Sequence, residues 1–260
     1  MREPWEILTT GPPDAARSVL LLPGGAMAAR SFSLVMAEPV ASTFRLVATT
    51  PPGMGDGPLS GDVSMPGLSR HDGELAKQRG CDVVVGFSHG ATVALDMVLS
   101  GHFHGAVVLL GISLTTPDES GFFRSVVRAS EKVGVWPMAT LLRLLPLMAT
   151  SAKTTESHKQ ELLADIKSNG ARDAVRVSGA YLDYIAAKRD PAALLAASGS
   201  PVWVVHAEKG DGGLTNAERA TLEAAPNITL VTIPGSVFFL PDEAPQQTAE
   251  VIASAAAQAT

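Results

Sequence analysis

Residues 86–90 read Gly-Phe-Ser-His-Gly, so a serine stands between two glycines at the end of an apolar run. A serine hydroxyl can attack an acyl group when a sharp turn between a strand and a helix presents it to a ligand. Such a turn leaves little room for a β-carbon on either side of the serine, and glycine meets that need. The run 82–87 is typical of a buried strand, and 91–100 has a helical pattern. We therefore predict that Ser88 is a nucleophile exposed at such a turn.

The elements that must position Ser88 alternate along the chain. Short apolar runs predict strands at 18–22, 44–49, 82–87, 106–110, 201–206 and 228–233. Between them, helical patterns lie at 29–40, 66–79, 91–100, 216–225 and 242–257. This alternation is typical of parallel strands joined by helices. The predicted fold class is α/β, with a mostly parallel central sheet flanked by helices.

One long interval, 115–198, has no convincing strand and carries helical patterns at 119–133, 136–147, 155–168, 172–187 and 191–197. A helical insertion of this kind is expected to cover the carboxyl edge of the sheet, where pockets form. We predict a core of residues 1–114 and 199–260 and a helical cap of 115–198. The apolar residues of the cap either line a pocket or pack its underside, and we expect packing for most of them: Phe122, Phe123, Val126, Trp136, Leu141, Leu145 and Met148.

The composition of the 260-residue chain favours a small apolar or neutral ligand. Charged residues make up 18% and the formal net charge is −6, which does not suggest a nucleic-acid surface. The longest apolar stretch, 133–149, is interrupted by Pro137, Arg143 and Pro146 and is shorter than the roughly 20 residues of a spanning helix. Metal-ligand spacings and nucleotide-loop spacings are missing. We expect no metal, no cofactor, no nucleic acid and no membrane partner, and the oligomeric state stays open.

Two features bear on the cellular compartment. The single cysteine, Cys81, cannot form an internal disulfide, which suits a reducing compartment. The first residues lead into polar, proline-containing sequence rather than an apolar run that ends at a cleavage site. We therefore expect no signal peptide and a cytoplasmic location.

Four ordered segments make the chain resemble the α/β-hydrolase fold family over nearly its whole length. The first is Leu-Leu-Leu-Pro-Gly-Gly at 20–25, and the second is Thr-Pro-Pro-Gly-Met-Gly-Asp at 50–56, with Thr50 in place of the family's acid. The third is the turn at Ser88, which is similar to the family's nucleophile elbow. The fourth is Ile-Pro-Gly at 233–235, which precedes the histidine loop in relatives. By this resemblance we place the cap between the sixth and seventh core strands.

The resemblance also implies roles around Ser88. Serine acyl transfer needs a base, a group that orients the base, and donors for the developing oxyanion. The donors are expected to be the backbone N–H groups of Gly25 and His89, whose side chains do not matter for that role. The orienting acid of relatives aligns with Gly210, so Asp211 takes this catalytic role if the loop is one residue longer. Asp211 is equally well an ordinary turn aspartate.

The histidine base that the resemblance calls for is missing. Residues 233–241 read Ile-Pro-Gly-Ser-Val-Phe-Phe-Leu-Pro, which places Phe238 at its usual position. Phe238, Phe239 and Met54 are expected to line the pocket instead.

The six histidines all have ordinary structural explanations. We expect His89 to line the pocket, His206 to end a buried strand and His158 to lie on a solvated face of the cap. The other three are expected on a surface helix or beside the glycine turn after the Ser88 helix: His71, His102 and His104.

These observations support a hydrolase that acts through Ser88 on a small apolar ester, thioester or lactone, with an incomplete or unorthodox triad. One alternative is a cyclase, lyase or isomerase that uses the oxyanion donors and the capped pocket without a histidine base. Another is a non-catalytic protein whose cap closes on a ligand. Fluorophosphonate labelling of Ser88 separates the first hypothesis from the other two.

Overall fold

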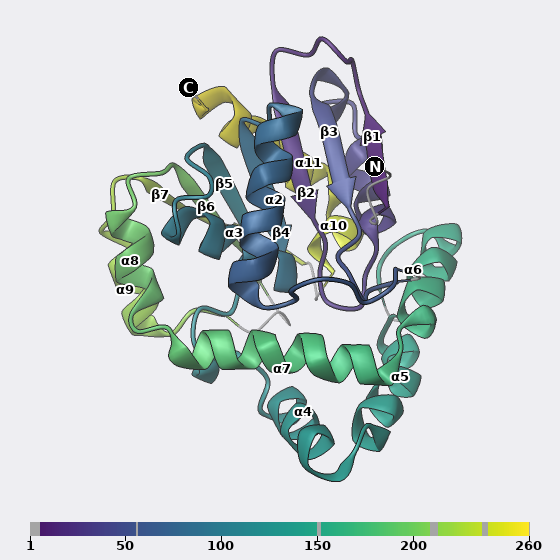
Figure 1. Cartoon of the computed structure of the whole chain (residues 1–260). Helices are drawn as coiled ribbons and strands as arrows, with labels where there is room; N and C mark the ends of the chain where they lie inside the picture. Colours follow the sequence, from purple (N-terminus) through teal and green to yellow (C-terminus); the bar gives the residue numbers. More distant parts are fainter. Residues whose placement is uncertain (1–5, 56, 150–151, 209–212, 236–238, 260) are drawn as a thin grey trace.

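A seven-stranded sheet organises the chain, whose computed structural model describes residues 6–55, 57–149, 152–208, 213–235 and 239–259 (Figure 1). Its order is β1-β3-β2-β4-β5-β6-β7. In this sheet β1 runs antiparallel to β3, and the other neighbours are parallel. The strands are β1 (Ile7–Thr10), β2 (Ser18–Leu22), β3 (Arg45–Thr49), β4 (Val83–Phe87), β5 (Ala106–Leu110), β6 (Val202–Ala207) and β7 (Ile228–Ile233).

The sequence predicted six of these strands to within one residue at each end, and the α/β fold class is confirmed. It missed β1, an edge strand of four residues that are half-buried or exposed. Because an exposed edge strand lacks a continuous apolar run, periodicity gives little signal for it. The inner strands β2, β4 and β5 are buried along their whole length, which is why their apolar runs were so clear.

Helices cover both faces of the sheet, and alternate residues of each strand serve the two faces. On β2, Val19 and Leu21 pack with α1 (Ser33–Ala37) and α11 (Pro245–Gln258). The intervening Leu20 and Leu22 pack with α2 (Met65–Arg79) and α3 (His89–Leu99). The sheet therefore has a hydrophobic core on each side, and α3 lies directly against the strands that lead to Ser88.

Five helices separate β5 from β6: α4 (Gly121–Val133), α5 (Trp136–Ala149), α6 (Glu156–Ser168), α7 (Ala171–Ala187) and α8 (Pro191–Ala197). Below we call α4–α8 the helical insertion. In Figure 1, α4, α5 and α7 lie beyond the carboxyl end of β3. The insertion thus follows the fifth strand of the described chain, whereas it was expected to follow the sixth. The expected number of strands before the insertion was one too high, because β1 is the only described strand before β2.

The remaining elements are short 3-10 and α-helices. They are η1 (Ala29–Phe32), η2 (Ala41–Thr43), η3 (Thr116–Asp118), α9 (Asn216–Glu223) and α10 (Leu240–Glu243), with η denoting a 3-10 helix. The helix expected at 242–257 is divided into α10 and α11, because Ala244 leaves the helical conformation and Pro245 starts a new helix. No helix among the described residues combines the length and apolarity that a membrane span requires.

Candidate functional site

The chain turns sharply at Ser88, between β4 and α3. Ser88 has φ 49° and ψ −111°, an unusual conformation for a residue with a side chain. A β-carbon on Gly86 would lie 2.2 Å from the carbonyl oxygen of Gly90, and one on Gly90 would lie 2.2 Å from that of Leu22. Both contacts are too short for any residue but glycine. The two glycines that flank Ser88 in the sequence are therefore required by the backbone.

Ser88 opens into a cavity of about 290 Å³ between the sheet edge and the helical insertion. Ser88 itself is partly exposed, and most of the surrounding residues are apolar. Four of the insertion residues that were expected mainly to pack line this cavity: Phe122, Phe123, Leu141 and Leu145. The last three also pack against the hydrophobic core, as expected. The other lining residues are Gly24, Gly25, Ala26, Met27, Gly53, Met54, Phe87, His89, Glu119, Ser120, Met138, Leu142, Ile166, Asn169, Ala174, Val177, Ser178, Tyr181 and Phe239.

The sequence-predicted site residues fall into two groups. Gly25, His89, Met54 and Phe239 line the same cavity as Ser88. The other two, Asp211 and Phe238, lie outside the described residues. The structure therefore brings together residues from loops that are far apart in the chain, as parallel strands do at their carboxyl edge.

Two backbone donors beside Ser88 are unused. Among the described residues, the N–H groups of Gly25 and His89 make no hydrogen bond. His89 is the first residue of α3, so its N–H has no partner within the helix. A β-carbon on Gly25 would lie 3.9 Å from the β-carbon of His89, so the two residues are close neighbours. An oxygen atom bound near Ser88 would find two free donors on this side of the cavity.

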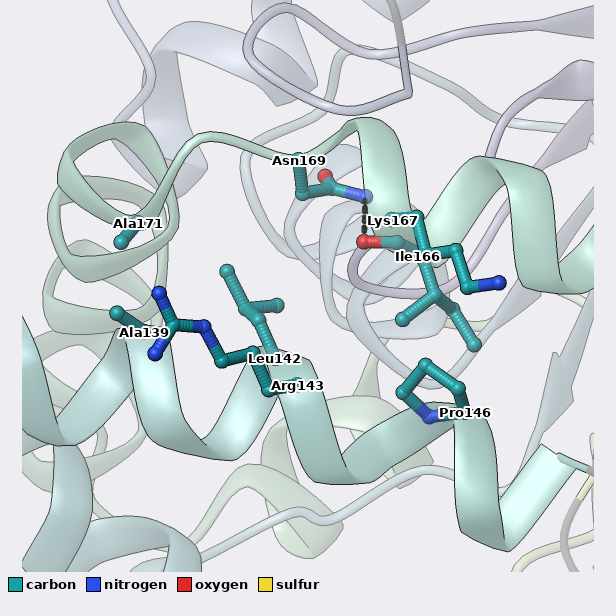
Figure 2. Close-up of a pocket in the computed structure, with 8 residues that line it drawn as sticks. All are labelled: Ala139, Leu142, Arg143, Pro146, Ile166, Lys167, Asn169 and Ala171. Atoms are coloured by element: carbon teal, nitrogen blue, oxygen red, sulfur yellow. Dashed lines mark hydrogen bonds between the residues drawn. The ribbon is translucent and has the colours of Figure 1, made fainter.

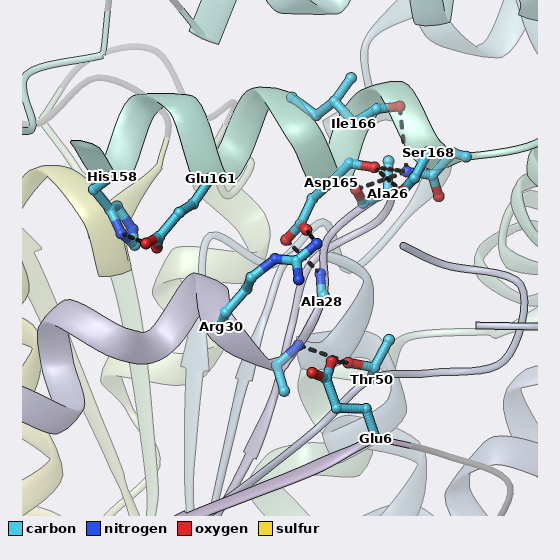
Figure 3. Close-up of polar contacts among 12 residues, drawn as sticks. Glu6, Ala26, Ala28, Arg30, Thr50, His158, Glu161, Asp165, Ile166 and Ser168 are labelled. Atoms are coloured by element: carbon cyan, nitrogen blue, oxygen red, sulfur yellow. Dashed lines mark hydrogen bonds and ion pairs between the residues drawn. The ribbon is translucent and has the colours of Figure 1, made fainter. Parts of the chain in front are cut away.

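Helix α6 holds the loop that carries Gly25 (Figure 3). The Asp165 carboxylate accepts a hydrogen bond from the Ala28 N–H (3.2 Å) and forms an ion pair with Arg30. The Asn169 side-chain amide donates to the carbonyl oxygen of Ala26 (3.0 Å), a residue with φ 62°. The loop is thus fixed from the insertion, across about 140 residues of sequence. Sequence reasoning missed both Asp165 and Asn169, and nothing in their local pattern signals these contacts.

Thr50 fixes the same loop from the opposite side. Its hydroxyl oxygen accepts a hydrogen bond from the Ala29 N–H (2.8 Å) and donates to the Glu6 carboxylate (2.7 Å), as Figure 3 shows. Thr50 occupies the position where the sequence departs from the expected acid. Glu6 supplies a carboxylate there from a different part of the chain.

The imidazole of His89 is buried against the cavity. His89 is 6% exposed, and neither ring nitrogen has a hydrogen-bond partner among the described residues. Burial lowers the pKa of His89 to about 4, so the ring is neutral near pH 7. The ring of Tyr181 lies 6.0 Å away, and its hydroxyl donates to the Glu119 carboxylate (2.7 Å).

No hydrogen bond between the Ser88 hydroxyl and a histidine is found in the described part of the chain, which contains all six histidines. His102 instead pairs with the Ser69 hydroxyl (2.9 Å), and His206 is buried in β6. Of the six, His89 is the one that lines the described cavity.

His158 was expected on a solvated face, and the structure corrects this. It is 4% exposed, with Nε2 2.5 Å from Oδ1 of Asp242 and Nδ1 3.3 Å from Oε2 of Glu161. The reason is the position of α6, which packs its His158 face against α10 rather than against water. A sequence pattern on one helix cannot reveal an acidic partner 84 residues away.

A second cavity, of about 370 Å³, lies among α5, α6 and the start of α7 (Figure 2). It shares Leu142, Ile166 and Asn169 with the Ser88 cavity. Arg143 and Lys167, both exposed, are at its rim. Because Ser88 is not among its lining residues, it is a neighbour of the candidate site rather than part of it.

The described residues contain no group of three or more histidine, cysteine or acidic side chains placed to hold a metal ion.

The comparisons with known proteins agree with this fold. The model of the family described as "Alpha/beta hydrolase family" matches residues 19–251. Among solved structures, an esterase from Rhodococcus sp. ECU1013 has a TM-score of 0.73 at 20% identity, with 98% of this chain and 95% of that chain covered. A thermophilic esterase from Thermogutta terrifontis has a TM-score of 0.72 at 18% identity, with 96% and 92% covered.

A third solved structure, the enol-lactonase from Burkholderia xenovorans LB400, has a TM-score of 0.71 at 11% identity, with 96% of this chain and 95% of that chain covered. Likeness at these identities shows the fold alone. Comparison with curated proteins gave no match.

Proposed function

Since the chain belongs to the alpha/beta hydrolase family, we propose that it is a serine-dependent hydrolase of small, apolar or neutral esters, thioesters or lactones. The observation that supports this proposal is the setting of Ser88: a sharp strand-to-helix turn at the wall of an apolar cavity, beside two backbone N–H groups that make no hydrogen bond to the described residues. Free donors next to a nucleophile are what a tetrahedral oxyanion needs.

In this proposal the Ser88 oxygen attacks the acyl carbon, and the carbonyl oxygen takes up negative charge between the Gly25 and His89 N–H groups. The new Oγ–C bond replaces the bond to the leaving alcohol or thiol, which receives the proton that Ser88 gives up. Water then attacks the acyl-serine, releases the carboxylic acid and returns the proton to Ser88. Each half-reaction forms an oxyanion at the same place, so the two N–H donors stabilise the transition state of both steps.

The catalytic group that sets the rate is the base, and here the proposed triad is incomplete. Phe238 stands where relatives have histidine, and Asp211 remains as the proposed acid. When a serine protease loses its triad, about 10³- to 10⁴-fold acceleration over water remains, from oxyanion donors and substrate binding. We therefore expect turnover that is slow for this family.

The helical insertion, within residues 115–198, is proposed to act as a cap on a core of residues 1–114 and 199–260. Side chains from α4, α5, α6 and α7 line the Ser88 cavity, which supports this assignment. A cap of this kind excludes water and shapes the site around the acyl group. The partner is accordingly a small molecule that fits a cavity of about 290 Å³.

A second candidate function follows from one observation: among the described residues, no histidine is hydrogen-bonded to the Ser88 hydroxyl. The same donors and cavity would serve a cyclase, lyase or isomerase that stabilises an enolate, or a protein that only binds its ligand. Neither role needs Ser88 to be deprotonated.

The decisive experiment is labelling of the purified protein with a fluorophosphonate probe, alongside turnover of p-nitrophenyl acetate and butyrate. The proposal expects labelling and slow turnover, both lost in Ser88→Ala. It also expects a gain of at least tenfold in Phe238→His, with Phe239→His as a matched control that gives no gain. An unlabelled, inactive protein that Phe238→His leaves inactive would overturn the hydrolase proposal and favour the second candidate.

A further inference from the structure

The wall of the Ser88 cavity carries one acidic side chain. Among the described residues that line the cavity, Glu119 is the only acidic one, and none is a lysine or an arginine. The histidine of the lining, His89, is neutral near pH 7 because burial lowers its pKa to about 4. Glu119 is half-buried, and most of the remaining lining is apolar. A ligand in this cavity would therefore meet a single carboxylate in apolar surroundings.

The Glu119 carboxylate is held by two other residues of the cavity lining. The Tyr181 hydroxyl donates to Oε2 at 2.7 Å, and the backbone N–H of Ser120 donates to Oε1 at 2.7 Å. Both donors belong to residues that line the Ser88 cavity, so the carboxylate lies at the cavity wall between them. A carboxylate has about four acceptor positions. Each oxygen can therefore accept a further hydrogen bond from a ligand.

Glu119 forms no ion pair with a lysine or an arginine in the part of the chain that the structure describes. The basic residue nearest to it in the sequence, Arg124, is not among the cavity-lining residues. Burial raises the pKa of the Tyr181 hydroxyl, and the negative charges of Glu119 and Asp118 raise it further. The charge of Glu119 is thus left for a ligand to balance.

Aromatic surface lies next to this carboxylate. Phe122 and Phe123, in the first turn of α4, line the cavity together with Tyr181. The face of an aromatic ring attracts a cation through its quadrupole. An anionic ligand would be repelled by Glu119, and a fully apolar ligand would cover the carboxylate without supplying a partner, which is unfavourable. A carboxylate beside aromatic rings favours a ligand with one positive charge.

We propose that Glu119, with Phe122, Phe123 and Tyr181 beside it, binds an alkylammonium group of the substrate. The site then prefers esters, thioesters or lactones that carry one positive charge over uncharged ones of the same shape. This inference rests on the proposed function and names the substrate class of the same site, but it departs from that proposal in the charge of the substrate. The apolar part of the lining accommodates the hydrocarbon part of such a molecule.

The test uses two pairs of esters in which a trimethylammonium group is exchanged for a tert-butyl group of the same shape. In the first pair the group is on the acyl part: p-nitrophenyl 4-(trimethylammonio)butyrate and p-nitrophenyl 5,5-dimethylhexanoate. In the second pair it is on the leaving group: the acetyl thioesters of 2-(trimethylammonio)ethanethiol and 3,3-dimethylbutane-1-thiol. The measured quantity is the ratio of kcat/KM within each pair, charged over uncharged.

We expect this ratio to fall tenfold or more for at least one pair in Glu119→Gln, which keeps the size of the side chain and removes its charge. A loss of this size is typical of a hydrogen bond to a charged group. Comparing the ratio between proteins cancels the intrinsic reactivity of the esters and any general loss of activity. Glu131→Gln is the matched control, because Glu131 on α4 pairs with Arg128 and is not a lining residue, and it should keep the native ratio.

Ratios that Glu119→Gln leaves unchanged in both pairs, or that Glu131→Gln lowers equally, would overturn the inference while the hydrolase proposal stands. If no ester is turned over, binding to the Ser88→Ala protein decides instead. Dissociation constants of methyl 4-(trimethylammonio)butyrate and methyl 5,5-dimethylhexanoate are then measured by ligand-observed NMR. Preferential binding of the charged ester that disappears in Ser88→Ala/Glu119→Gln supports the inference without the hydrolase. Binding of the charged ester that is no tighter than that of the uncharged one overturns it.

Discussion

Nε2 of His158 lies 2.5 Å from Oδ1 of Asp242, and both side chains are almost completely buried. The contact joins α6 of the helical insertion to α10, which follows residues 236–238 closely. Burial lowers the pKa of His158, but the hydrogen bond and charge of Asp242, helped by Glu161, raise it further, so the net shift is upward. Burial raises the pKa of Asp242 to about 6, although His158 opposes this. The pair thus holds a proton between the insertion and the core.

Breaking this pair on one side should destabilise the protein strongly. His158→Leu leaves the Asp242 carboxylate buried without its partner, which costs about 3–5 kcal/mol for buried pairs. Urea unfolding should show that loss. The double variant His158→Leu/Asp242→Leu should recover most of it, because an apolar pair of similar size needs no solvation. A double variant as unstable as the single one would show that the ion pair itself is not the source of the effect.

The loop that carries Gly25 should lose its geometry when α6 releases it. Asp165→Asn keeps the size of the side chain but leaves a single oxygen for two donors, the Ala28 N–H and the Arg30 guanidinium, so one of the two contacts that hold the loop is lost. We expect kcat for p-nitrophenyl butyrate to fall about tenfold or more, with a smaller change in KM, because a displaced oxyanion donor acts in the transition state. Lys167→Ala, an exposed neighbour on the same helix, should change neither constant. If the fall in kcat is explained entirely by a smaller folded fraction, and the rate per folded molecule is unchanged, Asp165 has no positioning role.

Gly86→Ala should prevent the turn at Ser88 from forming. The added methyl group would lie 2.2 Å from the carbonyl oxygen of Gly90, and backbone atoms on both sides cannot give way. We expect a loss of several kcal/mol in the free energy of unfolding, typical of severe overpacking. Gly121→Ala is the control, because a β-carbon there meets its nearest neighbour only at 3.7 Å, the Arg124 guanidinium, at the start of α4. Differential scanning calorimetry of both variants tests this, and similar midpoints would contradict it.

Asp72 should make stability depend on pH. It is buried on α2, and burial raises its pKa from 3.8 to about 8. Between these values the folded state keeps a proton that the unfolded state releases, so the free energy of unfolding falls as pH rises from about 4 to about 8. Asp72→Asn should flatten this decline in urea titrations at several pH values.

Asp62→Asn is the control for that experiment. Hydrogen bonds from Ser64 lower the pKa of Asp62, which gives a contribution of the opposite sign that is lost as pH falls. The decline between pH 4 and 8 should therefore persist in Asp62→Asn. A flat profile in the native protein would contradict the assignment to Asp72.

The sequence alone determined the features that depend on neighbouring residues. Buried strands such as 106–110 can be recognised as apolar runs, because both faces of a covered parallel sheet are shielded from water. Gly86 and Gly90 mark the turn at Ser88 because the backbone there has no space for a β-carbon. These local requirements were enough to predict the fold class and the turn at Ser88, whereas Gly25 and His89 were named through the resemblance to a known family.

Contacts between distant segments were decided only by the tertiary structure. Three features depend on how the insertion and the N-terminus pack on the sheet. They are the edge strand β1, the hydrogen bond from Ala28 to Asp165, and the burial of His158 against Asp242. The same holds for Phe122, Phe123, Leu141 and Leu145, whose apolar pattern is identical whether a side chain fills a core or lines a cavity. Hydrophobic periodicity tells which side of a helix is dry, and the three-dimensional arrangement alone determines what that side faces.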